Sequence, residues 1–282
     1  MRMGFMLKAV KHSVAVGALL ITTSAFAADP FEPQVVEMPP YQPPQVVEKS
    51  VSTGNWYLRG DAGYHWSELR GIHYYTAPPI QAQTFATHEL KGAFSIGGGV
   101  GYKISKHFRT DLTADYWLKA DFNGSTTNGV DVSSDASAYS ALLLMANAYV
   151  DLGTYHGITP YVGAGIGGAY VKWDDLANTI GTTTTYHEGN AEWRFAWALM
   201  AGASYCLTDS LELDAGYRYA NISGGEMFGI AEGAGPGYDE GMHVHEARAG
   251  LRFALGGQGS ANCAQPQVVS YEPPSFEPPV YK

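Results

Sequence analysis

The chain has little charge and very few cysteines for its length of 282 residues. Only 16% of the residues are charged, and Asp and Glu outnumber Lys and Arg by 27 to 17, which gives a formal net charge of −10. This acidic balance argues against a nucleic-acid-binding protein, because phosphate backbones are bound by basic side chains. Two cysteines are too few for a disulfide-rich scaffold or for a zinc site built from several thiolates.

Long hydrophobic runs are absent beyond the N-terminal segment. The longest, from Ala141 to Val150, is about half of the roughly 20 residues that a membrane-spanning helix needs. The first residues differ, because a basic start precedes a short apolar segment, and Ala25-Phe26-Ala27 offers small residues at a cleavage site. This pattern predicts a signal peptide over residues 1–27 and export from the cytoplasm.

Proline is nearly absent from the middle of the chain. Eleven of the 15 prolines lie within residues 28–54 and 256–282, and Pro-Gln-Val-Val occurs three times there, beginning at Pro33, Pro44 and Pro266. This composition predicts a proline-rich N-terminal tail over 28–54 and a similar C-terminal tail over 256–282, both extended. Between them we expect a single domain over residues 55–255.

Eight segments of this domain alternate apolar and polar residues with a period of two, as half-buried β-strands do. In the first segment, Trp56, Leu58 and Tyr64 share one face, whereas Arg59 and Asp61 share the other. We expect strands over residues 56–66, 93–104, 108–122, 139–151, 160–173, 193–207, 211–220 and 245–255. Each is long enough for the roughly 9–11 residues with which a tilted strand crosses a membrane.

A soluble β-sandwich is the alternative for eight alternating strands. Trp and Tyr near the strand ends favour an outer-membrane barrel, as do short connections that alternate with long ones beginning at Ser67, Asn123, Asp174 and Asn221. The sequence therefore predicts an all-β protein, an eight-stranded antiparallel up-and-down transmembrane β-barrel with long external loops. Because the number of strands is even, both proline-rich tails are expected on the periplasmic side, with the short turns.

The polar faces of the strands carry charges of both signs. We expect them to fill the lumen, because a barrel of eight strands has an interior just wide enough for side chains. The expected network comprises Arg59, Asp61, Lys103, Arg109, Asp111, Asp115, Lys119, Asp151, Arg194, Glu212, Asp214, Arg218, Glu246, Arg248 and Arg252. Such near-balance of charge favours mutual neutralisation and hence a structural and interaction role. A small-solute channel is the main alternative.

The sequence contains no motif that identifies an enzyme or a cofactor site. His65 and Ser95, with a nearby carboxylate, only weakly resemble a Ser–His–acid triad. We therefore expect them to be hydrogen-bonded side chains that fill the lumen, and a lipid hydrolase is a remote alternative. His243 and His245 are spaced i, i+2 on one strand face, which raises the alternative of a haem- or metal-binding surface. Without a third ligand they define no such site, so we predict neither a metal nor another cofactor.

The expected loops are strongly acidic. They contain few basic residues, Arg70 and Lys91, against Glu68, Glu89, Asp131, Asp135, Asp174, Asp175, Glu188, Glu192, Glu226, Glu232, Asp239 and Glu240. We therefore expect contact with anionic lipopolysaccharide only through divalent cations, and no binding of nucleic acid or heparin. The loops carry no chemical signature of an external partner.

The two cysteines are expected at the same end of the barrel. Cys206 ends the sixth strand beside a short turn, and Cys263 follows the last strand. The segment from Leu255 to Cys263 could cross the mouth of a small barrel, since extended chain covers roughly 3.3 Å per residue. In an oxidising compartment a disulfide between them is plausible, and two unpaired thiols are the alternative.

Several phrases of the sequence resemble the small outer-membrane surface-antigen barrels of alphaproteobacteria. They lie at 56–61 (WYLRGD), 151–154 (DLGT), 159–167 (TPYVGAGIG), 215–219 (AGYRY) and 245–252 (HEARAGLR). The resemblance covers residues 55–255 and implies the OmpA-like eight-stranded fold and an envelope or surface role, with no catalytic residues. The chain departs from many such barrels in that Phe253, the last aromatic strand residue, is followed by 29 further residues.

The resemblance also implies a partner for the N-terminal tail. Barrels of this type can be attached to peptidoglycan through a mature N-terminus that begins Ala-Asp. Cleavage after Ala27 would expose Ala28 and Asp29, which are therefore the expected attachment point. Tails without a partner are the alternative.

Overall fold

The structure is a computed structural model that describes residues 55–77, 79–127, 129–256, 260 and 262–263. The strands are β1 (Asn55–Leu69), β2 (Ile72–Thr76), β3 (Gln81–Thr84), β4 (Thr87–Leu90), β5 (Ala93–Lys103), β6 (Phe108–Ser125), β7 (Ser134–Asp151), β8 (Ile158–Trp173), β9 (Leu176–Ile180), β10 (Thr183–His187), β11 (Ala191–Cys206), β12 (Leu211–Phe228) and β13 (Ala234–Ala254). The described residues include no helix that is long and apolar enough to cross a membrane.

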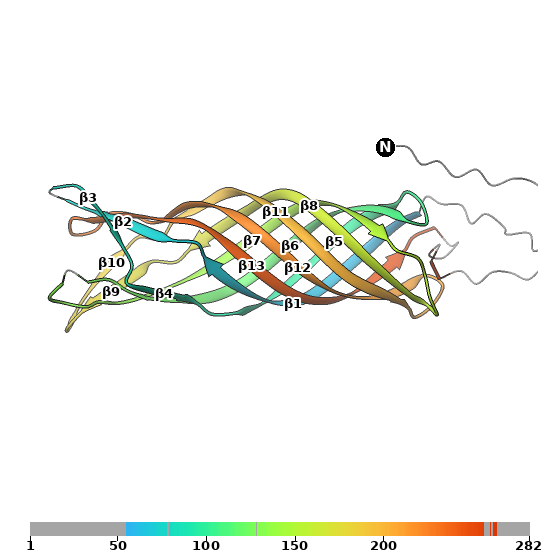
Figure 1. Ribbon diagram of the computed structural model, residues 1–282, viewed down its shortest axis with the longest axis horizontal. Helices are drawn as coiled ribbons and strands as arrows, with labels where there is room; N and C mark the ends of the chain where they lie inside the picture. The colour runs from blue at the N-terminus through green and yellow to red at the C-terminus, as the bar shows by residue number, and fades with distance from the viewer. Residues whose placement is uncertain (1–54, 78, 128, 257–259, 261, 264–282) are drawn as a thin grey trace, which may run out of the picture. The chain divides into compact units, whose positions relative to one another are not determined.

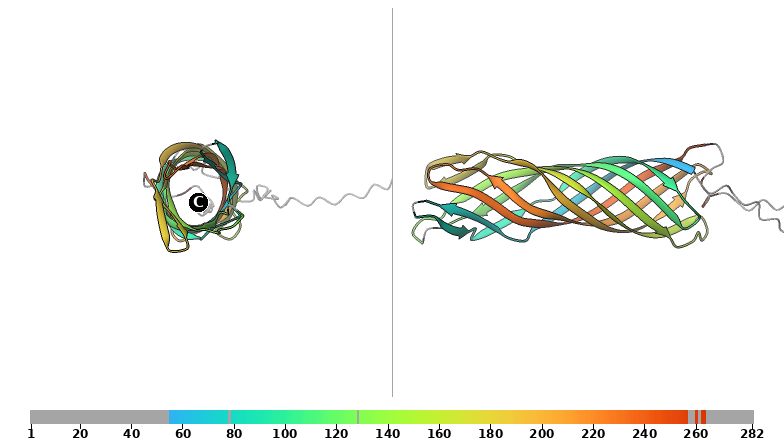
Figure 2. Two further views of the ribbon diagram at one scale, coloured as in Figure 1. Left: turned by 90° about the vertical axis from the view of Figure 1, so that its left-hand side faces the viewer. Right: turned by 90° about the horizontal axis from the view of Figure 1, so that it is seen from above.

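Eight of these strands form a closed antiparallel barrel. Their order around the ring is β1, β5, β6, β7, β8, β11, β12 and β13, and β13 pairs again with β1. Figure 2 shows this ring along its axis. The structure therefore confirms the predicted eight-stranded β-barrel.

The two ends of the barrel differ, and we name them by what they carry. At the terminal end, β1 begins, β13 ends, and short turns join β5 to β6, β7 to β8 and β11 to β12. The loop end, on the left in Figure 1, carries the longer connections and the short strands β2, β3, β4, β9 and β10. These short strands pair with one another or continue the wall, because β2 pairs with β13, β4 with β6 and β9 with β7.

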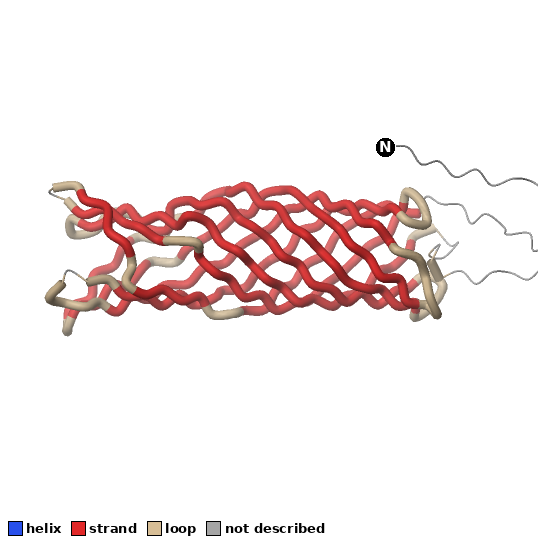
Figure 3. Tube along the Cα trace, viewed as in Figure 1, coloured by secondary structure: helices blue, strands red, loops and turns tan. Residues whose placement is uncertain are grey.

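The barrel strands reach further toward the loop end than the sequence predicted. β7 begins at Ser134, five residues before the expected start, β12 continues to Phe228, and β13 begins at Ala234. Much of the loop expected after Asn221 is therefore a β-hairpin, and strand continues close to the tips of the loop end in Figure 3.

The outward faces of the strands form an apolar band bordered by aromatic side chains. At the terminal end, exposed Trp56 contacts Tyr102 edge-on, with ring centroids 5.2 Å apart. At the other border stand Tyr64, Trp66, Phe94, Tyr116, Tyr170, Trp193 and Tyr217, all exposed. Two aromatic girdles around an apolar band are the surface of an outer-membrane barrel.

Candidate functional site

Charged side chains fill the lumen in the half nearer the terminal end, and a further buried pair, Arg194 with Asp239, lies closer to the loop end. Of the fifteen residues expected inside, fourteen have buried side chains: Arg59, Asp61, Lys103, Arg109, Asp111, Asp115, Asp151, Arg194, Glu212, Asp214, Arg218, Glu246, Arg248 and Arg252. They are seven cationic and seven anionic groups. This balance matches the requirement that buried charges be paired.

The pairs are short and connected to one another. Arg59 contacts Asp61 at 2.8 Å and Asp111 at 2.9 Å, and Arg252 contacts Asp214 at 2.6 Å. Tyr161 donates its hydroxyl proton to the same Asp214 carboxylate over 2.7 Å. Because Asp214, Arg59 and Arg218 each contact more than one partner, the contacts tie several strands of the barrel together.

Lys119 is the exception, and its predicted position in the lumen is wrong. The pairing of β6 with β7 shifts between Trp117 and Ala120, where β6 contains one extra residue. A β-bulge of this kind reverses the faces of the residues that follow it. Lys119 therefore points outward, 63% exposed, and contacts Asp174 at 2.6 Å.

A packed apolar layer lies in the lumen between the charged residues of the terminal half and the loop end. Its largest buried side chains are Trp117, Phe122, Tyr139, Leu143, Val171, Trp173, Ile222 and Met242. Along β12 and β13 the inward residues change from charged to apolar at Ala220 and at Val244. The expectation of a lumen filled by charge along its length is thus wrong for this layer, beyond which Arg194 and Asp239 form a separate buried pair.

The structure does not assemble the weak triad suggested by His65 and Ser95. The His65 ring stacks on Trp117, with centroids 4.9 Å apart, and its Nδ1 lies 3.5 Å from the Tyr139 hydroxyl. Ser95 instead donates to the Glu246 carboxylate over 2.5 Å. Both side chains are buried in the lumen and contact neighbouring side chains there. This is the interpretation that the sequence analysis preferred over a triad.

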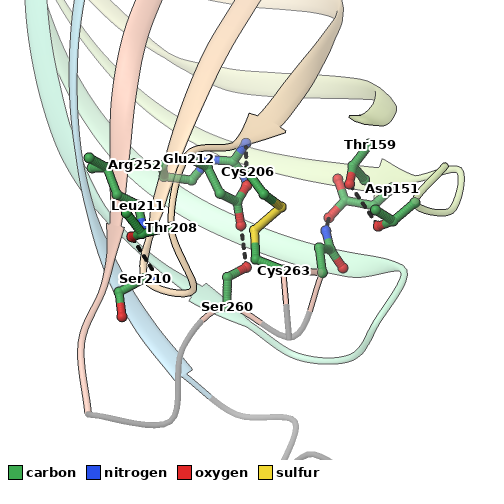
Figure 4. The surroundings of a disulfide bond; sticks show 12 residues. Asp151, Thr159, Cys206, Thr208, Ser210, Leu211, Glu212, Arg252, Ser260 and Cys263 are labelled. Carbon is green, nitrogen blue, oxygen red and sulfur yellow. Dashed lines mark hydrogen bonds and ion pairs between the residues drawn. A yellow bond between two sulfur atoms is a disulfide. The ribbon is translucent and has the colours of Figure 1, made fainter. Parts of the chain in front are cut away.

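Three described residues that follow β13, Ser260, Asn262 and Cys263, contact the terminal end of the barrel. A disulfide joins Cys206 at the end of β11 to Cys263, whose Cα atoms are 5.5 Å apart (Figure 4). Ser260 hydrogen-bonds the Glu212 carboxylate inside the mouth, and Asn262 donates to Asp151 over 3.3 Å. The disulfide and these polar contacts hold the three residues against the charged side chains at the mouth of the lumen.

The loop end carries a cavity of about 170 Å³, which we call the cup. Its lining residues are Tyr74, Thr76, Phe85, Thr126, Thr127, Asp131, Leu176, Asn178, Ile180, His187, Phe228 and Ala234. Each of the four connections at the loop end, together with the strands on either side of it, contributes lining residues to the cup. The cup is therefore a property of the assembled loop end and of no single loop.

One side of the cup is aromatic. Phe85 packs edge-on against Tyr74 at 5.7 Å and against Phe228 at 6.3 Å between ring centroids. Phe85 also contacts Phe122 of the apolar layer at 5.9 Å, so the aromatic side is continuous with the packed lumen. His187 contacts Phe228 edge-on at 5.2 Å.

The other side of the cup is polar. Asn178 and Ser133 donate to the two carboxylate oxygens of buried Asp135 over 2.5 and 2.9 Å, which holds the Asn178 side chain in place. Burial raises the pKa of Asp135, which lies beyond the apolar band, although these two hydrogen bonds oppose the shift. Aromatic rings and an amide group that line one cavity suit a small ring that carries polar substituents.

Comparison with known proteins identifies the family. Residues 14–253 match the family model described as outer membrane protein beta-barrel domain. The chain belongs to this family. The match confirms the resemblance seen in the sequence, and it places the chain among the outer-membrane barrels of Gram-negative bacteria.

Relatives of this chain include an outer membrane protein and a candidate adhesin. An uncharacterized protein of Brucella suis biovar 1 is 37% identical over 279 residues, covering 84% of this chain and 95% of the relative. PagN, an outer membrane protein of Salmonella typhimurium, is 27% identical over 177 residues, covering 58% and 73%. A candidate adhesin of Rickettsia prowazekii is 27% identical over 209 residues, covering 71% and 87%. The outer membrane protein OprG from Pseudomonas aeruginosa aligns with 72% of this chain and 96% of its own, at 12% identity and a TM-score of 0.46.

Two features of the structure were not predicted from the sequence. The cup depends on residues from four separate connections, and no local pattern relates them. Asp135 and Asp239 were expected among the solvated loop acids, but both are buried, and Asp239 contacts Arg194 at 2.6 Å. Extending the two-residue alternation of β13 back through Glu240 and Asp239 to Tyr238 would have placed the Asp239 carboxylate inside the barrel.

Proposed function

We propose that the barrel is a structural and interaction protein of the outer membrane, whose loop end faces the exterior and binds a partner through the cup. The observation that carries this proposal is the cup itself, because all four loop-end connections converge on it. The apolar layer beneath it supports a closed barrel, since packed side chains leave no wet path for ions. A channel, the main alternative, needs such a path.

The chemistry of the cup indicates the kind of group it accepts. A cavity of about 170 Å³ holds roughly one ring, since cavities of about 150 Å³ accommodate benzene. Asp131 and Asp135 lie on or behind its polar wall, so an anionic group is disfavoured. The partner should therefore present an uncharged ring with polar substituents, from a glycan or from a protein side chain.

The test uses the full chain in lipid nanodiscs, applied to arrays of immobilised glycans and peptides at physiological salt. We expect retention on a subset of features that present uncharged rings. Phe85→Ala or Asn178→Ala should reduce it about tenfold, the effect of losing an aromatic contact or a hydrogen bond in a buried site. Tyr186→Ala is the matched control, because Tyr186 belongs to β10 but is 67% exposed and does not line the cup.

Two results would contradict the proposal. The first is binding that the cup substitutions leave unchanged, which would place recognition elsewhere on the loop end. The second is a stable and reproducible single-channel conductance of the pure protein in planar bilayers, which would favour the channel. An enzyme is not expected, and a lipid-hydrolase activity lost in Ser95→Ala would reverse that expectation.

A second role, attachment to the cell wall, is supported by the topology. β1 begins and β13 ends at the same end of the barrel, so the chain enters and leaves the barrel at that end. With the loop end outside, that end faces the periplasm and its peptidoglycan. The expected attachment residues Ala28 and Asp29 lie outside the described residues.

We therefore expect part of the protein to remain with the cell wall after boiling in detergent, until the wall is digested enzymatically. Replacing Ala28 and Asp29 while preserving signal cleavage should release it into the detergent fraction, because the attachment needs that N-terminus. The measurement is the fraction of protein that sediments with purified wall. Complete extraction of the unmodified protein would leave the tails as spacers without a partner.

A further inference from the structure

Two histidines stand on the outer wall of the barrel where the apolar band ends. His243 and His245 alternate with buried residues of β13, so both face outward. Toward the terminal end, the outward residues of the same strand are Ala247, Ala249 and Leu251. The pair therefore occupies the level at which lipid acyl chains give way to headgroups.

Neighbouring strands present aromatic and polar residues at the same level. His245 lies between Trp66 of β1 and Tyr219 of β12, and it is paired in register with both. The Trp66 and His245 rings are stacked, with centroids 5.8 Å apart. One row nearer the loop end, His243 lies between Glu68 and Asn221. The two imidazoles are thus part of an ordered patch on three strands.

Hydrogen bonds orient both imidazole rings. The Nδ1 atom of His243 lies 2.6 Å from the Tyr219 hydroxyl and 3.1 Å from Asn221 Nδ2, and the Nδ1 atom of His245 bonds to the Tyr217 hydroxyl. Because an amide nitrogen only donates, Nδ1 of His243 accepts, and the proton of its neutral ring lies on Nε2. Neither Nε2 atom has a hydrogen-bond partner among the residues that the structure describes.

The charge of the patch depends on these histidines. The charged groups around the pair are Glu68, opposite His243 on β1, exposed Glu240 of β13, and Arg70, which follows β1 and whose guanidinium lies beside Gly241. Histidine gains a positive charge on mild acidification. Protonation of the two imidazoles therefore adds positive charge next to Glu68, Glu240 and Arg70.

We propose that His243 and His245 form a binding site for the phosphate group of an anionic membrane lipid, which strengthens on acidification. Phosphate oxygens accept hydrogen bonds from the two Nε2–H groups, and the lipid acyl chains lie along the apolar outward surface below. A metal ion fits less well, because no group of three or more His, Cys, Asp or Glu side chains in the described residues could hold one. The proposal is independent of the cup.

The experiment reconstitutes the full chain in phosphatidylcholine nanodiscs with a minor fraction of phosphatidic acid, whose headgroup is a phosphate monoester. Lipids that remain bound to the released protein are counted by native mass spectrometry at about pH 5.5 and about pH 8. We expect about a tenfold enrichment of phosphatidic acid at the lower pH, the size of one charge-assisted hydrogen bond, and little at the higher pH.

Variants separate the site from the general attraction of anionic lipid. His243→Gln with His245→Gln should abolish the enrichment, whereas His88→Gln, an exposed histidine of β4 in the loop end, should retain it. Glu68→Gln should increase it, because a carboxylate that repels phosphate is removed. Equal enrichment in the wild type and the double variant, or enrichment that ignores pH, would refute the site. Heat-dependent gel mobility checks that each variant is folded.

A further arm identifies the source of the phosphate. Excess inorganic phosphate should leave the enrichment at the lower pH unchanged, because the acyl chains contribute to binding a membrane lipid. Displacement of phosphatidic acid by inorganic phosphate would overturn the assignment to a lipid and favour a free anion at the same histidines.

Discussion

Replacing Arg218 with methionine is expected to lower the free energy of unfolding by about 3–5 kcal/mol. The Arg218 side chain is 2% exposed, and its guanidinium contacts Asp115 and Glu246 at 2.6 Å each. Methionine fills much of the same volume but leaves two carboxylates in the lumen without their cation. The cost is that of uncompensated buried charge, which exceeds the cost of the lost hydrogen bonds. Urea unfolding in lipid vesicles measures it.

The matched control is an ion pair on the surface. Lys91 contacts Asp121 at 3.5 Å with both side chains more than half exposed, so Lys91→Met should cost no more than about 1 kcal/mol. Neutralising the partners as well, with Asp115→Asn and Glu246→Gln in the Arg218→Met background, should recover part of the loss. If the triple variant is no more stable than Arg218→Met, packing rather than charge is what Arg218 provides.

The outward face of the barrel was predictable because the lipid imposes one rule on every strand. Trp56, Leu58 and Tyr64 share the exposed face of β1 as predicted, and Leu112 and Ile166 do the same on β6 and β8. A strand in a bilayer must place apolar residues outside at every second position, whatever its neighbours are. The eight strands and their order therefore follow from local patterns alone.

The strands near the loop end were less predictable because their apolar residues face the lumen, whereas apolar residues of the membrane-spanning part face outward. In β12, Tyr217 and Tyr219 face outward among apolar neighbours, whereas beyond them Asn221 faces outward and Ile222 is buried inside. Outside the bilayer the exterior is water, so the lumen becomes the only place for apolar side chains. A search for apolar outward residues consequently ends the strand near residue 220, eight residues before its end in the structure.

Lys119 and the cup were missed for a different reason. The bulge that turns Lys119 outward is a single extra residue in β6 relative to β7, and register is a relation between two strands. The cup likewise requires knowing that Phe85, Asn178 and Phe228 meet, although they are far apart in sequence. Such contacts depend on closure of the whole barrel, which residue periodicity does not encode.

Two adjacent leucines test whether the apolar layer is dry. Leu143 faces the lumen and is fully buried, whereas Leu144 faces the lipid and is 44% exposed. Leu144→Ala should cost about 2 kcal/mol, the transfer of three carbon atoms from water to lipid, because lipid fills the space left behind. Leu143→Ala should cost about 4 kcal/mol, since it loses the same transfer energy and also leaves a cavity in a packed interior.

The order of the two effects distinguishes a packed lumen from a water-filled one. If water occupied the lumen around Leu143, removing its side chain would expose little additional apolar surface, and no cavity energy would be lost. Leu143→Ala would then cost less than Leu144→Ala. Urea unfolding of both variants in the same vesicles gives the comparison, in which the unfolded states are equivalent because the sequences differ only by the position of one alanine. A larger loss at Leu144 than at Leu143 would remove the physical basis for a closed barrel and reopen the channel.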